Sequence, residues 1–226
     1  MLDTIIAFMR FIKRVLVHAQ SSITRGIRTI KRLLLTNIVP GGILKANLCS
    51  GTQKIPGYFN IDFNRGADLR LDLAKNDLPF RTESLEALVC ISAINYFTRS
   101  RAQELVHEVY RVLKPGGIVR FGVQDMETIA QRYIAKDKDF FFQKLSDGRD
   151  RFEGPTLGDK FAAWFYGYAI KGIPCQYFYD YDSLAFLFTT AGFSLVERKN
   201  FQESRLENSH LIDNRPDQMF FLEAIK

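Results

Sequence analysis

The chain has 226 residues, of which 46% are hydrophobic and 25% charged, a composition typical of a globular protein that can bury a full core. Its net charge of +6 lies in the first 40 residues, which hold seven basic residues and one acidic residue; the remaining 24 basic and 24 acidic residues cancel. The body is therefore neutral, and the basic residues have no interleaved aromatic side chains, which disfavours nucleic acid as a partner.

The three cysteines, Cys49, Cys90 and Cys175, have no CxxC spacing and cannot all pair. This pattern favours a reducing compartment and argues against a zinc site, so we predict a cytoplasmic protein and no metal. No stretch of 18 uncharged apolar residues is present, so the sequence predicts no membrane-spanning helix.

Residues 1–40 form a predicted basic arm, with one or two amphipathic helices over 1–35. Its apolar residues recur every three or four positions: Leu2, Ile5, Met9, Ile12 and Leu16, then Ile23, Ile27, Ile30 and Leu34. Two interpretations stay open. The arm could bind a protein partner or lie peripherally on the inner face of the cytoplasmic membrane, or it could pack across the body with its charges in water.

Residues 41–226 form the predicted main domain, which begins with apolar segments that alternate with turns or helices. Strands are expected at 43–48, 58–61, 68–71 and 85–91, followed by a helix with a buried face over 102–113 and a fifth strand at 118–123. Only ten residues separate Gly51 from Asp62, so the first crossover is expected to be a loop shaped by Pro56 and Gly57. This alternation is typical of a parallel sheet.

After a helix that begins near Met126, residues 135–181 are expected to form a cap over the substrate. Residues 140–181 hold 13 of the chain's 30 aromatic residues, which predicts either a substrate-binding lid or the core of a small subdomain. A helix over 182–191 and strands at 193–197 and 219–224 complete the pattern. The predicted fold class is α/β, a Rossmann-like seven-stranded sheet that is mostly parallel with an antiparallel last strand.

Several ordered sequence strings resemble the class I S-adenosylmethionine-dependent methyltransferases, and in particular a small bacterial branch of the methyltransferase type 11 kind. They are Ala46-Asn47-Leu48-Cys49-Ser50-Gly51, Pro56-Gly57-Tyr58-Phe59-Asn60-Ile61-Asp62, Leu78-Pro79-Phe80 and Arg111-Val112-Leu113-Lys114-Pro115-Gly116-Gly117. The likeness covers residues 45–134 and resumes in short strings after residue 179, including Asn214-Arg215-Pro216.

The resemblance implies that the cofactor is S-adenosyl-L-methionine. The residues expected to bind it are Asn47, Cys49, Ser50, Gly51, Asp62, Asp72, Leu73, Ser92 and Asn95. Gly51 would let the backbone approach the cofactor, Asp62 would accept hydrogen bonds from the ribose hydroxyls, and Asp72 would accept one from the adenine amino group. The alternatives are that Asp62 only ends a strand, that Asp72 caps a short helix, and that Cys49 is a tolerated small residue where the family has glycine.

The histidines that the family commonly has near the acceptor are replaced here by Ala93-Ile94-Asn95 and Cys175-Gln176. We therefore predict Asp125 as the general base, with Tyr96 and Tyr179 as positioning groups, while Asp125 could instead cap the helix that follows it. The expected function is methyl transfer to a hydroxyl of a small molecule or of a glycan or lipid-linked acceptor, by analogy with polysaccharide biosynthesis. The alternative is a non-catalytic protein that binds a ligand or partner on the same fold.

Overall fold

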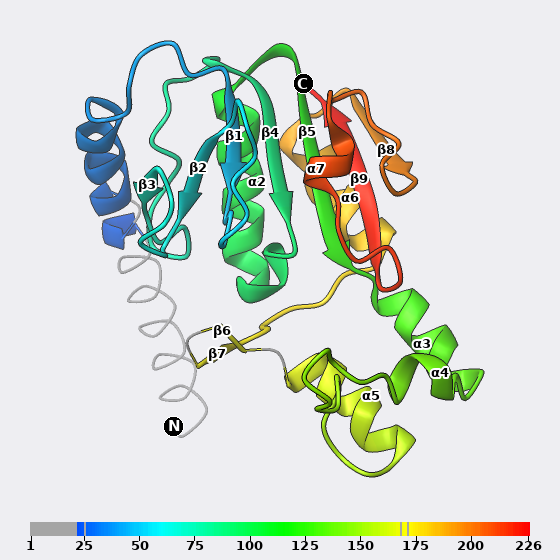
Figure 1. Ribbon diagram of the computed structural model, residues 1–226. Coiled ribbons are helices and arrows are strands. Elements are labelled where there is room, and N and C mark those ends of the chain that lie inside the picture. Colours follow the sequence, from blue (N-terminus) through cyan, green and yellow to red (C-terminus); the bar gives the residue numbers. More distant parts are fainter. Residues whose placement is uncertain (1–21, 25, 168, 171) are drawn as a thin grey trace, which may run out of the picture.

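The computed structural model describes residues 22–24, 26–167, 169–170 and 172–226. Its centre is a seven-stranded sheet in the order β3-β2-β1-β4-β5-β9-β8 (Figure 1). The strands are β1 (Lys45–Leu48), β2 (Phe59–Asp62), β3 (Leu69–Arg70), β4 (Leu85–Ile91), β5 (Leu113–Gln124), β8 (Leu195–Lys199) and β9 (Met219–Ile225). The first five run parallel, and β9 runs antiparallel to both β5 and β8. The predicted fold class is therefore confirmed.

The sheet begins with the short crossover that the sequence predicts. Residues 49–58 connect β1 to β2 through turns without a helix, and Gly57 has a φ of 80°. One boundary differs from the prediction, because helix α2 (Arg99–Val112) ends before Leu113 and β5 begins there. The amide of Gly116 donates to the carbonyl of Lys226, so the Lys-Pro-Gly-Gly segment extends the pairing of β5 with the end of the last strand.

The main core lies between the sheet and two helices, α2 and α6 (Tyr181–Ala191), which both cover one face (Figure 1). Helix α2 starts at the Thr98 cap and buries Ala102, Leu105, Val106, Val109 and Val112, as its sequence periodicity predicts. Each larger apolar side chain buried in this way contributes about 1.5–3 kcal/mol. The opposite face carries a smaller core that includes Ile212 of helix α7 (Ser209–Ile212).

The segment predicted as a cap, residues 135–181, follows α3 (Met126–Ile134). It contains α4 (Lys138–Phe141), α5 (Leu157–Tyr166), β6 (Ala169–Ile170) and β7 (Ile173–Pro174). Figure 1 places these elements beyond the carboxyl ends of β4 and β5. Phe140, Phe141, Phe152 and Trp164 are buried together in a separate small core. Most of the aromatic residues thus stabilise a subdomain, which is the second of the two interpretations of this segment.

Residues 22–24 and 26–36 are helical and lie beside the β3 edge of the sheet (Figure 1). The expectation of an apolar face packed on the body with its charges in water does not hold for these residues. Arg28 pairs with Glu104 of α2 at 2.5 Å and Arg32 pairs with Glu108 at 3.3 Å, whereas Ile23, Ile27 and other apolar residues face solvent. The first half of the predicted arm, residues 1–21, lies outside the described residues.

No helix within the described part of the chain is both long and apolar enough to cross a bilayer.

Candidate functional site

A cavity of about 500 Å³ opens at the carboxyl ends of β1, β2 and β4. Ligands commonly bind at this edge of open α/β sheets, and the volume lies within the usual range of small-molecule pockets. Eight of the nine residues predicted to bind the cofactor line it: Asn47, Cys49, Ser50, Gly51, Asp62, Asp72, Leu73 and Ser92. The topology therefore brings together residues that are up to 45 positions apart in the sequence.

The turn after β1 forms one wall and has two residues in the left-handed region, Cys49 at φ 53° and Gly51 at φ 57°. Glycine adopts this conformation without strain, whereas cysteine does not. A hydrogen bond with Cys90, together with burial, raises the pKa of the Cys49 thiol well above its usual value. The thiol is therefore protonated at neutral pH, as expected for a small wall residue rather than a nucleophile.

Asp62 ends β2 with its side chain at the cavity wall, and the residue is only 4% exposed. Its Oδ2 accepts a hydrogen bond from the amide of Gly51 at 2.9 Å, and its Oδ1 accepts one from the amide of Asn64 at 2.7 Å. A carboxylate can accept about four hydrogen bonds, so two backbone donors leave acceptor capacity for a ligand. The same contacts fix the carboxylate against the glycine turn.

Asn47 stabilises the same turn through its side-chain amide. Its Nδ2 donates to the carbonyl of Gln53 at 3.2 Å and to Oδ1 of Asn60 at 3.0 Å. The amide nitrogens of Asn60 donate in turn to Asp68, and the Asp68 carboxylate also accepts a bond from Lys54. These bonds, that of Lys54 first, lower the pKa of Asp68 to about 2. Asn47 thus supports the wall with its amide donors.

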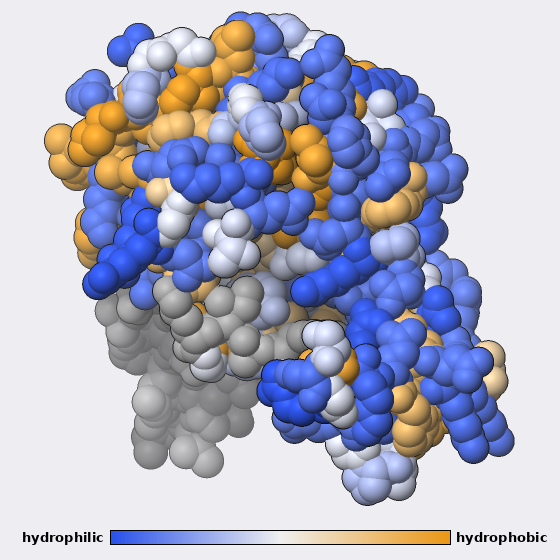
Figure 2. Space-filling view, in the orientation of Figure 1, coloured by the Kyte–Doolittle hydropathy of each residue, from blue (hydrophilic) through white to orange (hydrophobic). Residues whose placement is uncertain are grey.

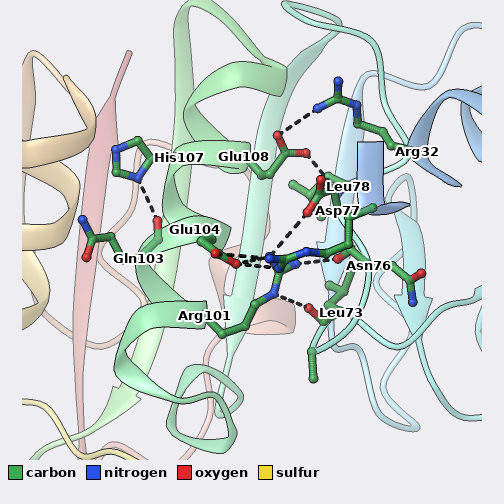
Figure 3. A network of polar contacts seen from close by, with 12 residues as sticks. Arg32, Leu73, Asn76, Asp77, Leu78, Arg101, Gln103, Glu104, His107 and Glu108 are labelled. Atoms are coloured by element: carbon green, nitrogen blue, oxygen red, sulfur yellow. Dashed lines mark hydrogen bonds and ion pairs between the residues drawn. The ribbon is translucent and has the colours of Figure 1, made fainter. Parts of the chain in front are cut away.

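Asp72 and Leu73 form the opposite wall. Asp72 Oδ1 accepts a bond from the amide of Ala74 at 3.0 Å, so this residue closes a turn and faces the cavity at the same time. Arg101 of α2 fixes the segment, because its Nε donates to the carbonyl of Leu73 at 2.9 Å and its Nη2 donates to the carbonyl of Asn76 at 2.5 Å (Figure 3). The buried Arg101 therefore stabilises this wall through hydrogen bonds to its backbone carbonyls.

The turn after β4 contributes Ser92, which has a φ of 58°, and Tyr96 to the cavity. Asn95, the ninth predicted cofactor residue, is not among the lining residues. It is fully buried, and its Nδ2 donates to the carbonyl of Tyr177 at 3.1 Å. Its Oδ1 has no hydrogen-bond partner within the described residues. In this structure Asn95 ties the turn to the cap segment instead of forming the wall.

The three residues predicted to act in catalysis are placed differently from one another. Tyr96 lines the cavity, whereas Asp125 and Tyr179 are buried outside its lining. Asp125 accepts bonds from the Glu127 amide, from Thr128 and from Arg198, which are the contacts of a helix-capping acid. Burial raises the pKa of Tyr179, so its phenol is a neutral group at physiological pH.

Sequence reasoning missed several lining residues, among them Phe63, Asn64, Ile173, Gln176, Ile212, Asn214 and Arg215. The string Asn214-Arg215-Pro216 belonged to the resemblance, but nothing in it indicated a place at the cavity. This string lies at the cavity because β9 runs antiparallel to β5, so the residues before Met219 lie at the carboxyl ends of the parallel strands. Ser92 Oγ lies 3.4 Å from Asn214 Oδ1 across this junction.

Within the described residues, no group of three or more histidine, cysteine or acidic side chains is arranged to hold a metal ion. His107 is on the exposed side of α2, where its Nδ1 contacts the carbonyl of Gln103 (Figure 3).

The chain is similar in sequence to known methyltransferases. The protein family described as "Methyltransferase domain" matches residues 62–121. The ubiquinone/menaquinone biosynthesis C-methyltransferase UbiE of Desulfotalea psychrophila is 34% identical over 128 residues, which is 56% of this chain and 46% of that protein. The match thus spans about half the length of the curated relative.

Among solved structures, a Thermotoga maritima S-adenosylmethionine-dependent methyltransferase, a possible histamine N-methyltransferase, superposes with a TM-score of 0.48 and 15% identity, covering 94% of this chain and 96% of that one. A Mesorhizobium loti S-adenosylmethionine-dependent methyltransferase has a TM-score of 0.47 and 18% identity, covering 85% and 96%.

The family match over residues 62–121 and the similarity to the C-methyltransferase agree with the resemblance to class I S-adenosylmethionine-dependent methyltransferases. The resemblance inferred from the sequence is thereby confirmed.

Proposed function

We propose that this protein binds S-adenosyl-L-methionine in the cavity at the carboxyl edge of the sheet and transfers its methyl group to an acceptor. The observation that carries the proposal is the Asp62 carboxylate, which is buried at the end of β2, fixed by two backbone amides, and still faces the cavity. Such a carboxylate suits two ribose hydroxyls, which donate a pair of hydrogen bonds.

The other walls fit the remaining parts of the cofactor. Gly51 leaves the space beside its backbone open, since a Cβ built there would contact nothing within 4 Å. Leu73 offers an apolar surface next to the Asp72 carboxylate, a pair that suits an adenine ring and its amino group. When bound, the cofactor supplies a methyl group activated by its sulfonium. The protein's contribution is to orient acceptor and cofactor, and proximity alone can provide about 7–11 kcal/mol.

For the acceptor we propose an oxygen nucleophile, a hydroxyl of a small molecule or of a glycan or lipid-linked acceptor. Tyr96, Ile173 and Gln176 line the cavity from the turn after β4 and from the cap, and offer both an apolar surface and hydrogen-bonding groups. We propose Asp125 as the base, with Tyr96 and Tyr179 as positioning groups. If Asp125 is the base, Asp125→Asn should abolish turnover of the hydroxyl acceptor; full turnover would assign Asp125 to capping α3.

Carbon is the second candidate for the acceptor atom, because the matched relative is named as a C-methyltransferase. The two cases differ in the product. Transfer of a ¹³C-labelled methyl group to cell extracts, followed by carbon NMR, separates a methyl on oxygen from a methyl on carbon by chemical shift. A product with its label on carbon would reject our choice of oxygen and leave the cofactor assignment intact.

A non-catalytic ligand-binding protein on the same fold is the remaining alternative. Isothermal titration calorimetry with S-adenosylhomocysteine tests it, because a methyltransferase also binds this product. We expect binding by the folded protein, whereas an absence of heat with both this compound and S-adenosylmethionine would favour the non-catalytic alternative.

The variant Asp62→Asn tests, by the same calorimetry, whether the Asp62 carboxylate binds the ligand. It keeps one carbonyl oxygen but loses the charge, and it should weaken binding of S-adenosylhomocysteine by about 1.5–3 kcal/mol, the scale of a hydrogen bond to a charged group. The matched control is Asp182→Asn on the exposed side of α6, which should bind as tightly as the wild type. Thermal unfolding of both variants checks that each is folded. Equal affinity for Asp62→Asn and wild type would remove Asp62 from the site.

We also propose that the protein is a cytoplasmic enzyme and that its basic arm binds it peripherally to the inner face of the membrane.

A further inference from the structure

The N-terminal helix presents its apolar side to solvent. Side chains at three- and four-residue spacing along residues 23–38 are between 51% and 68% exposed: Ile23, Ile27, Ile30, Leu33, Leu34 and Ile38. Figure 2 shows apolar side chains gathered on this side of the molecule, over the helix and the connection to β1. We call the surface made by these six residues the outer stripe.

The helix is fixed in this orientation from its other side. Arg28 donates to both carboxylate oxygens of Glu104, at 2.5 and 3.2 Å, and Arg32 donates to Glu108 at 3.3 Å (Figure 3 shows Arg32 pointing to Glu108). Leu35 and Val39 pack against the main core just after these pairs. The paired arginines and the partly buried Leu35 and Val39 therefore hold the outer stripe away from the body.

The receiving carboxylates are firmly placed. Glu104 also accepts a bond from Arg101 at 3.0 Å, and Glu108 accepts bonds from Arg111 and from the amide of Leu78. The hydrogen bonds of Arg28 and Arg101 lower the pKa of Glu104 against the opposing effect of its burial, so it is charged at neutral pH. This network thus attaches the helix to the body and leaves the outer stripe exposed.

We propose that the outer stripe docks on an anionic membrane surface. Charge complementarity selects this occupant, because the first 40 residues hold all of the chain's excess positive charge. Arg28 and Arg32 are paired with the body, whereas Lys31 is exposed and can meet lipid phosphates. Lys31 is exposed one helical turn after Ile27, so its stem can cover apolar surface while its ammonium reaches the headgroups.

The geometry describes a peripheral contact. An amphipathic helix with apolar residues on one side and basic residues beside them lies in the plane of the interface, and anionic lipids strengthen its binding. The proposal extends the sequence-based expectation for the arm, since it names the face that meets the lipid and shows that two of the arginines serve the body. It does not depend on the methyl-transfer proposal.

Vesicle co-sedimentation of the full chain tests the proposal. Wild-type protein should pellet with vesicles that contain phosphatidylglycerol, and should stay in the supernatant with pure phosphatidylcholine or at high salt. The triple variant Ile23→Gln, Ile27→Gln, Leu34→Gln keeps helix-compatible residues and removes half of the outer stripe. Its partition coefficient should fall about tenfold or more, because each lost apolar side chain weakens insertion.

The matched control is Ile134→Gln with Phe186→Gln, which removes exposed apolar side chains from other faces of the body and should leave vesicle binding unchanged. Titration with S-adenosylhomocysteine runs in parallel, so that a failure of the proposed function is seen separately. The proposal is overturned if the wild type stays in the supernatant at low salt, or if the triple variant pellets as well as the wild type. If the wild type does not bind vesicles but is a dimer, and the triple variant is a monomer, the outer stripe binds a second copy of the chain instead.

Discussion

At the scale of single residues, the turn after β1 depends on backbone angles that only glycine adopts freely. Gly51 has a φ of 57° and donates its amide to Asp62, so its conformation and the placement of the carboxylate are linked. The sequence indicated this position through its small-residue string. It gave no sign that Cys49, two residues earlier, would adopt a similar angle.

Gly51→Ala should therefore destabilise the protein by roughly 1–2 kcal/mol, since an alanine in the left-handed region is strained. Gly66→Ala provides a matched control in an exposed turn with ordinary φ and open space at the Cβ position. There we expect stabilisation of about 0.4–1 kcal/mol, because alanine restricts the unfolded chain. Urea unfolding measures both, and a Gly51→Ala variant as stable as Gly66→Ala would contradict the link.

Asp68 gives this region a defined pH dependence. Its folded pKa of about 2 lies below its ordinary value of 3.8, so its contribution to stability is present above 3.8 and is lost as the pH falls through 2. Asp68→Asn should be less stable than wild type at pH 5, and the difference should close near pH 2. Urea unfolding at several pH values tests this; a gap that stays constant with pH would mean that the charged form of Asp68 contributes nothing to stability through its bonds with Lys54 and Asn60.

At the scale of secondary-structure elements, a buried arginine joins β5, β9 and the loop after α7. Arg120 donates to both carboxylate oxygens of Asp213, at 2.7 and 2.5 Å, and to Glu223 at 3.0 Å, and all three side chains are fully buried. Asp213 directly precedes Asn214 and Arg215 on the cavity wall. The network therefore places a C-terminal segment beside the cofactor site.

Arg120→Met should reduce the free energy of unfolding by about 3–5 kcal/mol, because it removes the buried cation that pairs with two buried carboxylates. Arg149→Met is the control, since its pair with Asp147 is exposed and such pairs contribute about 0–1 kcal/mol. Chemical unfolding compares the two. A loss below 1 kcal/mol for Arg120→Met would show that the network is not structural.

The elements also show what the sequence could and could not predict. Strand alternation predicted the sheet, because it depends on local periodicity. The resemblance to the methyltransferases named eight residues that line the cavity, and they meet there because the carboxyl ends of parallel strands share one edge. The burial of Asn95 and Asp125 was not predictable, since a polar residue after a strand can face the cavity or cap the next helix. The orientation of the N-terminal helix depends on Glu104 and Glu108, about 76 positions away, which no local pattern reveals.

At the scale of the whole molecule, the cavity lies at the carboxyl ends of the parallel strands. The helix that carries the outer stripe lies beside β3, at the opposite side of the sheet from β8 (Figure 1). The Arg101 network links the two regions, since Glu104 meets Arg28 on the arm and Arg101 holds Leu73 at the cavity wall. Membrane docking and cofactor binding can therefore occur at once on separate surfaces.

The central claim is that this cavity holds the methyl-donor cofactor. A crystal structure of the full chain with S-adenosylhomocysteine tests it most directly. The account predicts that the ligand fills the cavity, with its ribose hydroxyls on the Asp62 carboxylate and its adenine beside Asp72 and Leu73. A ligand bound elsewhere, or a cavity that stays empty at saturating concentration, would contradict it.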